Sequence, residues 1–490
     1  MNSLLFDNSY AKLPDRFFAR VDPAQPTSPS LIALNRDLAL RLGMDPDWLE
    51  GPDGLDFLSG RVIAPGSEPI ATAYAGHQFG NFVPQLGDGR AILLGEMIDR
   101  EGRRRDVQLK GAGRTPYSRR GDGRAALGSV LREYLVSEAM AALGIPTTRS
   151  LAAIVTGDHV QRDRPLPGAV LVRVAASHIR VGTFQFFAAR QDVDALRILA
   201  DHVIERHYPG AALADRPYAA LLAQVVEAQA DLIARWMLVG FIHGVMNTDN
   251  MSVAGETIDY GPCAFLDPYD PSTVFSSIDQ HGRYAFGNQP QIGLWDLTRF
   301  AETLLPLLAD DENDAIAIAE EELAKFVPRF AKARVSGLLR KLGIVEARED
   351  DAQLVETVLA DLQRNLVDYT LFFRRLSGAV EPGAGEEPVR ELFADPTAAD
   401  ALFGTWRARL VLEKRSAAEI KQDMDAVNPS YIPRNHRIEE VISDAEKGDF
   451  ATFQILCGVL SRPFDDQPEH AAFQDPPLEH ERVRATFCGT

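Results

Sequence analysis

Cysteine is scarce in this sequence, with three in 490 residues. So few cysteines exclude a disulfide framework, and a reducing cytosol is the usual setting for a chain of this composition. Long hydrophobic runs are missing as well, since no apolar stretch approaches the roughly 20 residues that span a bilayer. We therefore expect no helical membrane anchor.

Positive charge is in short supply: Lys and Arg number 51 against 70 Asp and Glu, which gives a net charge of −19. This balance argues against a general affinity for nucleic acid or for an anionic membrane, since either would need a basic face. Residues 1–7 lack both a basic region and a cleavable apolar core, so we expect no export and a cytoplasmic protein. Hydrophobic residues at 46% and charged residues at 25% are typical of a globular protein.

The first 190 residues predict a mixed α and β region. Residues 1–75 are rich in proline and predict an N-terminal extension with one short helix over 30–42. Beyond Tyr74 glycines recur, and two strands, 90–95 and 107–110, are joined by a hairpin with a polar tip. A helix and two more strands follow, over 124–143, 151–155 and 169–174. This order of parts is that of the small lobe of a protein kinase.

A helical pattern occupies most of the remaining chain. Apolar residues at helical spacing predict helices over 193–208, 218–241, 294–308, 311–342, 353–376, 398–413 and 438–447. We predict an α+β, protein-kinase-like bilobal fold, in which a mixed small lobe lies on a larger, mainly helical lobe. The predicted parts are an N-terminal extension, a nucleotide-binding small lobe, a helical lobe and a C-terminal extension, over 1–75, 76–190, 191–430 and 431–490.

The densest polar chemistry lies on one loop, Ile-His-Gly-Val-Met-Asn-Thr-Asp-Asn at 242–250, with Asp259 following before Tyr and Gly. Kinase-like folds hold magnesium with an Asn on such a loop and an Asp before Gly. Asn250 and Asp259 are therefore candidate ligands for Mg²⁺ or Mn²⁺, which prefer hard oxygen donors. Counting from His243, the eighth position holds Asn250, but the third, where a kinase has its base, holds Val245.

Asp249 stands beside this Asn and could accept a proton from an incoming hydroxyl. The alternative for Asp249 is a helix cap or a turn residue. His243 is expected to brace the loop rather than to react.

The tetrapeptide Gly-Asp-Gly-Arg occurs twice, at 87–90 and at 121–124. Glycine lets backbone N–H groups approach phosphate oxygens, and the Arg that follows adds paired donors, although the same tetrapeptide is also an ordinary turn. Lys110 ends the strand after the first copy, and Glu133 lies on the next helix. In kinases such a Lys and Glu form an ion pair that positions the Lys at the phosphates. Either side chain could instead be a solvated surface charge.

Basic residues cluster around a single acid, Asp122, at Lys110, Arg114, Arg119, Arg120 and Arg124. In an acidic chain this local reversal favours phosphate binding, because guanidinium groups match phosphate geometry. Arg173, within an apolar strand, and Arg180, just past it, add two more cations. A buried Arg needs a partner, since an unpaired buried charge is costly. A triphosphate would serve, and so would a structural carboxylate.

The three cysteines differ in setting. Cys457 lies in an apolar stretch and is expected in the core, whereas Cys263 follows the metal loop and Cys488 lies near the C-terminus. The latter two thiols could meet and act as a redox switch, or could remain unpaired.

Together these motifs resemble those of the selenoprotein O family of kinase-fold proteins. The similarity runs nearly end to end. It rests on Phe-Asp-Asn-Ser-Tyr at 6–10, Ala-Gly-His-Gln-Phe-Gly at 75–80, Leu-Gly-Asp-Gly-Arg-Ala at 86–91, Gln-Leu-Lys-Gly at 108–111, Thr-Pro-Tyr-Ser-Arg at 115–119, and the two loop motifs at 243–250 and 259–262.

The resemblance implies a protein adenylyltransferase, which moves AMP from ATP to Ser, Thr or Tyr hydroxyls of target proteins and releases pyrophosphate, with Mg²⁺ or Mn²⁺. ATP then lies reversed relative to kinases, with its α-phosphate toward the acceptor. Asn250 and Asp259 match the family's metal ligands, Asp249 matches its proposed base, and Glu133 matches the partner of Lys110. Positions that match its nucleotide site are Gly87, Gly89, Arg90, Lys110, Asp122, Gly123, Arg173, Arg180 and Asp259.

The resemblance also implies a bridge between Cys263 and Cys488. Many members end in Cys followed by two serines, whereas this chain ends Cys488-Gly489-Thr490. Three other functions stay open: UMP transfer from UTP with manganese, conventional phosphoryl transfer with the γ-phosphate beside Asp249, and a nucleotide-binding scaffold without catalysis. We expect ATP and protein substrates as partners, and neither nucleic acid nor membrane.

Overall fold

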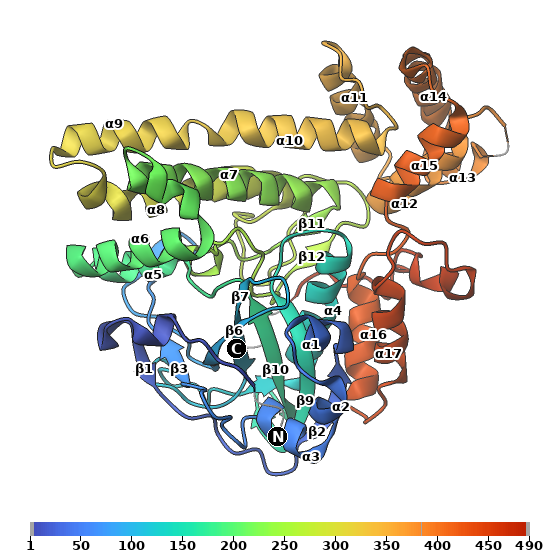
Figure 1. The fold of residues 1–490 in the computed structure, drawn as a ribbon. Helices are drawn as coiled ribbons and strands as arrows, with labels where there is room; N and C mark the ends of the chain where they lie inside the picture. Colours follow the sequence, from blue (N-terminus) through green and yellow to red (C-terminus); the bar gives the residue numbers. More distant parts are fainter. Residues whose placement is uncertain (1–3, 384, 487–490) are drawn as a thin grey trace.

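The structure is a computed structural model that describes residues 4–383 and 385–486. Strands gather in one half of the molecule, and long helices form layers across the other half (Figure 1). This mixture confirms the predicted α+β class. No helix in the described ranges combines the length and the apolar character that crossing a membrane requires.

The main sheet is antiparallel throughout, with the strand order β1-β3-β6-β7-β10-β9-β2 and β8 paired to β10. All four strands predicted from the sequence lie within it, in β6, β7, β9 and β10. Three of its strands come from the first 75 residues, so this segment is built into the sheet. The strand bounds are β1 Phe18–Arg20, β2 Ser30–Leu34, β3 Ile70–Thr72, β6 Ala91–Ile98, β7 Arg104–Lys110, β8 Ala125–Ala126, β9 Arg149–Gln161 and β10 Pro165–Ala175.

The helix predicted over 30–42 is wrong in its first half. Residues of β2 pair with β9, and only then does a short helix begin, α1 (Arg36–Arg41). Asn35 follows the last residue of the strand, and its side chain caps the helix by accepting a hydrogen bond from Leu38 N at 3.0 Å. A short apolar run fits a strand and a helix equally well, and the open edge of β9 decides the outcome here.

Strand alternation sorts the central side chains onto two faces. In the register of β7 and β10, Arg173 lies opposite Gln108 and Leu171 opposite Lys110. Because successive side chains point to opposite faces, these four share one face, while Leu109 points to the other. The Leu109 face packs on α1, α2 (Pro46–Glu50) and α3 (Pro52–Leu58). The Lys110 face is thereby left to helix α4 and the polar loop.

Helix α4 (Leu127–Ala142) packs beside α16 and α17, as in the edge-to-face contact of Tyr134 with Phe453 at 5.6 Å (Figure 1). Helix α7 leads into the polar loop, and helices α8, α9 and α10 pack against α7 (Figure 1). The bounds are α5 Val181–Ala188, α6 Val193–His207, α7 Pro217–Leu238, α8 Gln289–Leu308, α9 Glu312–Leu323, α10 Phe326–Lys341, α11 Asp351–Arg364, α12 Tyr369–Leu376, α13 Glu387–Arg390, α14 Pro396–Leu410, α15 Ala417–Val427, α16 Asn435–Ala445 and α17 Ala451–Leu460.

Two predicted helices are each divided into two. The helix predicted over 311–342 is α9 followed by α10, and the one over 353–376 is α11 followed by α12. In the second case Leu366 adopts a φ of 54°, a left-handed conformation that interrupts a helix. Asp368 then caps α12 by accepting from Leu371 N at 2.8 Å. Apolar periodicity continues across both breaks, which is why the pattern alone misses them.

Candidate active site

The polar loop is held between two short strands that pair with each other, β11 (Phe241–Ile242) and β12 (Ala264–Phe265). His243 follows β11, is buried, and its Nε2 lies 2.9 Å from the carbonyl oxygen of Ile258. Burial lowers the pKa of His243. Gln289 accepts from His243 N at 3.0 Å and donates to Phe241 O at 3.0 Å, which fixes the start of the loop.

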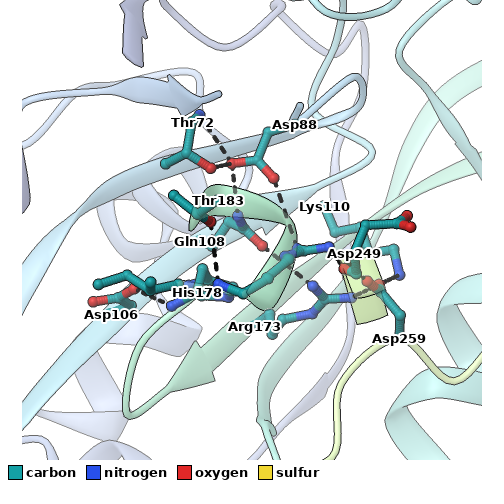
Figure 2. A network of polar contacts seen from close by, with 12 residues as sticks. Thr72, Asp88, Asp106, Gln108, Lys110, Arg173, His178, Thr183, Asp249 and Asp259 are labelled. Atoms are coloured by element: carbon teal, nitrogen blue, oxygen red, sulfur yellow. Dashed lines mark hydrogen bonds and ion pairs between the residues drawn. The ribbon is translucent and has the colours of Figure 1, made fainter. Parts of the chain in front are cut away.

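Four charged side chains meet where the sheet faces this loop. Lys110 Nζ lies 2.6 Å from Glu133 Oε2 and 2.7 Å from Asp259 Oδ1. Arg173, on the neighbouring strand β10, contacts the same two carboxylates, Glu133 through Nε at 2.8 Å and Asp259 through Nη2 at 2.6 Å. Figure 2 shows Lys110 and Arg173 converging on Asp259. The structure thus brings together the Lys and Glu that the sequence paired, and adds two partners.

Arg180 joins this cluster to the rest of the loop. It precedes α5, and its Nη1 lies 3.1 Å from Asp259 Oδ2 and donates to the backbone carbonyl of Asp249 at 2.9 Å. Its guanidinium lies over the Tyr74 ring, 4.6 Å from the centroid. On the far side Asp88 approaches it at 3.8 Å, itself held by hydrogen bonds from Thr72 N and Oγ1 at 3.0 and 2.7 Å (Figure 2).

Both carboxylates of the cluster are held ionised. Burial by itself would raise the pKa of Glu133, but Arg173 and Lys110 outweigh it and lower that pKa. Burial would also raise the pKa of Asp259, which Lys110, Arg173 and Arg180 bring well below its ordinary value. Asp259 adopts a φ of 66°, rare for a residue with a side chain, so the surroundings impose its orientation.

Asp249 lies in a different setting. Burial raises the pKa of its carboxyl to about 6. Oδ2 accepts a hydrogen bond from Gln78 Nε2 at 3.3 Å, whereas Oδ1 is buried without a hydrogen-bond partner among the described residues. Gly76 lies directly against it, since a Cβ there would be 2.5 Å from Oδ1. A carboxylate with a raised pKa and an unused oxygen can act as a general base near neutral pH.

Asn250 and Asp259 are the predicted metal ligands. The amide nitrogen of Asn250 donates to Val245 O at 3.0 Å, which leaves the amide oxygen as the end that can bind a cation. Amide and carboxylate oxygens are donors that Mg²⁺ and Mn²⁺ accept, so these residues fit such an ion chemically. Within the described ranges there is no cluster of three or more His, Cys, Asp or Glu side chains arranged for a metal.

The two Gly-Asp-Gly-Arg segments have packing partners in the structure. A Cβ on Gly87 would lie 2.4 Å from the Tyr117 ring, and one on Gly123 would lie 2.1 Å from Gly113 O. Both positions have a positive φ, of 114° and 70°. A Cβ on Gly89 would likewise come within 2.9 Å of Tyr117 O. The glycines therefore allow close backbone approach within the sheet-side loops.

Asp122 pairs with Arg162 at 2.9 Å and caps the N–H of Arg124, and the structure does not bring it to the Lys110 cluster. Arg90, in contrast, lines a cavity together with Lys110 and Glu133.

This cavity has a volume of about 490 Å³, within the usual range for a small-molecule site. Its walls include Tyr260 and Gly261 from the loop, Ser129 from α4, and residues 483–486 near the C-terminus. Thr486 fastens this tail, because its Oγ1 donates to Pro262 O at 2.7 Å.

Cys263 is buried beside this tail contact, and burial raises the pKa of its thiol to about 12. Cys488, its predicted partner, lies outside the described residues. Cys457, expected in the core, is half-buried on α17 and packs against the core.

Sequence reasoning missed three polar contributors: Asp88, Thr72 and Gln78. The Gly-Asp-Gly-Arg motif was interpreted through its Gly and Arg residues, not through Asp88, and Thr72 lies in the predicted N-terminal extension. Gln78 belongs to a motif quoted for the family resemblance, Ala-Gly-His-Gln-Phe-Gly, which was the one available signal for it.

Comparison with known proteins shows which family the chain belongs to. Residues 1–461 match the family described as Protein adenylyltransferase SelO. A protein of Rhodopseudomonas palustris (strain BisB5), named Protein nucleotidyltransferase YdiU, is 63% identical over 486 residues that cover 99% of both chains. Proteins with the same name from Methylorubrum populi and Bradyrhizobium diazoefficiens are 63% and 60% identical, again over 99% of both chains.

Proposed function

Because the chain belongs to the SelO family of protein adenylyltransferases and is a nucleotidyltransferase, we propose that it transfers AMP from ATP to Ser, Thr or Tyr hydroxyls of target proteins. The acceptor oxygen attacks the α-phosphorus, and the bond from this phosphorus to the oxygen that bridges to the β-phosphate breaks. Pyrophosphate leaves, and the proton of the hydroxyl passes to Asp249.

One observation carries this proposal: the cations of the site lie together at Asp259, and Arg180 bridges from them to Asp249. Lys110 and Arg173 lie on strands of the sheet, and Glu133 forms an ion pair with each of them. A polyphosphate tail neutralises such a cluster best when its β- and γ-phosphates enter it. The α-phosphate then remains on the side of Asp249, the group with an unpartnered oxygen and a pKa near 6.

Asn250 and Asp259 would hold a Mg²⁺ or Mn²⁺ ion. When bound, the metal neutralises charge on the phosphates and on the departing pyrophosphate. Arg180, through the Asp249 carbonyl, and Gly76, through close packing, keep the base in place.

We propose that the fold is kinase-like and bilobal, with the boundaries given above at 76, 191 and 431. The sheet with α4 supplies Lys110, Glu133 and Arg173, as a kinase small lobe does, and the polar loop lies at the end of α7 on the helical side (Figure 1). We also propose that the enzyme works in the cytoplasm, where ATP and reduced thiols are abundant.

UTP is an alternative to ATP as the substrate, because the name of the relatives, Protein nucleotidyltransferase YdiU, does not say which nucleotide they transfer. UMP transfer from UTP would use the same phosphate contacts and the same base. The polar contacts described here would bind phosphates, so they favour neither adenine nor uracil as the nucleobase.

The test is to incubate the protein and a mixture of proteins with ATP labelled at the α- or the γ-phosphate, and in parallel with α-labelled UTP. We expect protein-bound label from α-labelled ATP and none from γ-labelled ATP. Label from the γ-position would show a kinase, label from UTP alone a uridylyltransferase, and no label a scaffold. Asp259→Ala should abolish transfer, while Asp270→Ala, which lies beyond β12 and removes only turn contacts to Ser272, should not.

A further inference from the structure

A second cavity lies next to the polar loop and shares no lining residue with the cavity that Lys110 and Glu133 line. It is an open groove of about 610 Å³. One side is the turn between β4 (Gly76–Gln78) and β5 (Asn81–Val83), and the other is the segment after the loop and the start of α8. Phe79 lies on the first side, and Ile278, Asp279 and Arg283 lie on the second.

Hydrogen bonds tie this groove to the loop that carries the proposed base. Phe79 N donates to Asn247 Oδ1 at 3.1 Å, and Tyr284 Oη donates to the same oxygen at 2.6 Å. The neighbouring Gln78 contacts the Asp249 carboxylate. Both walls of the groove are therefore anchored within two residues of Asp249.

Arg283 is the charged side chain with unmet bonding capacity in this groove. Its Nε and Nη2 are buried and have no hydrogen-bond partner among the described residues. The guanidinium lies over the Trp295 ring, 4.7 Å from its centroid, and next to the turn at Gly80, where a Cβ would be 3.6 Å from Cζ. Rigid stacking of this kind presents the remaining N–H groups in a fixed direction.

The acidic residues nearby do not satisfy this guanidinium. Asp279 uses its carboxylate to accept from the backbone N–H groups of Arg283 and Tyr284, at 2.9 and 2.8 Å. Asp296 is fully buried, and neither of its oxygens has a hydrogen-bond partner in the described ranges. Burial raises its pKa well above the ordinary value, the nearby charge of Arg283 lowers it only in part, and the two side chains form no ion pair in the described ranges. Because Nε and Nη2 are buried, Nη1 is the guanidinium nitrogen that a ligand in the groove can reach. A charge-assisted hydrogen bond from it to a carboxylate would be stronger than a neutral one.

We propose that this groove binds the acceptor segment of the target protein, and that Arg283 pairs with an acidic side chain next to the acceptor hydroxyl. The inference rests on the proposed function and adds a substrate class to it: hydroxyl residues flanked by Asp or Glu. Ile278, which is 60% exposed and belongs to the same wall of the groove as Arg283, offers an apolar contact to the same segment. The segment then enters from the side of Asp249 and meets the α-phosphate there.

Binding tests this directly, apart from catalysis. The probes are two fluorescein-labelled peptides, Gly-Ala-Glu-Thr-Glu-Ala-Gly and the same peptide with Gln in place of both Glu, titrated with full-length protein by fluorescence anisotropy. We expect the Glu peptide to bind at least about tenfold more tightly, since a hydrogen-bonded charge pair has that strength. Arg283→Gln should abolish the difference between the peptides. The matched control is Arg299→Gln, because Arg299 stacks on the same Trp295 ring, at 5.2 Å, but pairs with Glu302.

A second variant tests the groove independently, in case Arg283→Gln fails to fold. Ile278→Glu places a carboxylate on an exposed position of the groove and should weaken the Glu peptide selectively. Equal binding of the two peptides to the unmodified protein, or a preference that survives Arg283→Gln, would overturn the inference. Transfer of α-label to both peptides without preference would leave the proposed function standing and this inference refuted. A binding preference without any transfer of α-label would support this inference and refute the proposed function.

Discussion

Arg173 Nη2 lies 2.6 Å from Asp259 Oδ1, although the two residues are 86 positions apart in the chain. The contact joins the sheet to the polar loop through a carboxylate that we also assign to the metal. Lys110 and Arg173 thus already have two carboxylate partners each, Glu133 and Asp259. We infer that the nucleotide's phosphates replace Asp259 at these cations and free its oxygens for the metal.

Glu133→Gln removes the carboxylate that fixes both cations. Two buried positive charges then share Asp259, so we expect a loss of about 3–5 kcal/mol in unfolding free energy. AMP transfer should fall by about 100-fold, the usual effect of losing one preorganised electrostatic group. Urea unfolding and the rate of α-label incorporation measure the two effects.

The control for this variant is Glu138→Gln, on the same helix. Glu138 Oε2 lies 2.6 Å from Arg149 Nη2, and this pair is not part of the Lys110 cluster. If both variants lose activity equally, helix α4 matters only for stability, and the positioning role of Glu133 is refuted.

Gly76→Ala tests whether Asp249 needs its present position. The added methyl would lie 2.5 Å from Oδ1, so the carboxylate must shift. A displacement near 1 Å costs about 100-fold in kcat, while the KM for ATP should change little. Gly404→Ala, on α14 with nothing within 4 Å, should leave kcat unchanged. Normal kcat in Gly76→Ala would argue against Asp249 as the base.

Glu256 predicts a pH dependence of stability. Burial raises the pKa of its carboxyl to about 7, so the folded protein keeps a proton that the unfolded chain releases near pH 4.5. Because the folded pKa is the higher one, this stabilisation is present below pH 4.5 and is lost as the pH rises toward 7. Glu256→Gln should match the unmodified protein at pH 4.5 and exceed its unfolding free energy at pH 8 by up to about 3 kcal/mol. Urea unfolding at both pH values checks this, and a pH-independent difference would contradict it.

Thr486→Val tests whether ATP binds in the cavity that Arg90, Lys110 and residues 483–486 line. The variant keeps the shape but loses the hydrogen bond from Oγ1 to Pro262 O. Losing about 1 kcal/mol of tail docking should raise the Kd for ATP about fivefold, measured by calorimetry. Thr298→Val loses a comparable bond, to Leu294 O on α8, and should leave ATP binding unchanged. Equal affinities in both variants would show that the tail is not part of the site.

The sequence predicts the parts of the site that follow from local order. Lys110 at a strand end and Glu133 on the next helix were paired from chain position, and the structure places them in contact. The sequence predicts that Arg173 needs a partner and that Arg173, Arg180 and Asp259 share one site. It cannot show that Asp259 itself is the partner, because only the tertiary fold brings the loop to the sheet. The same holds for β2, where pairing with β9 overrides a helical pattern.

The glycine segments show another limit. Gly87 was predicted to cradle phosphate, and the structure gives it a packing partner in Tyr117. A turn sequence cannot distinguish backbone approach to a ligand from backbone approach to a neighbouring loop. Its role at the nucleotide stays a prediction.

The orientation of the nucleotide is the centre of this account, and a crystal structure with a non-hydrolysable ATP analogue and Mg²⁺ tests it most directly. We predict the γ-phosphate within hydrogen-bond distance of Lys110 and Arg173, with the α-phosphorus on the side of Asp249. A γ-phosphate beside Asp249, with the α-phosphate at Lys110, would contradict the proposal.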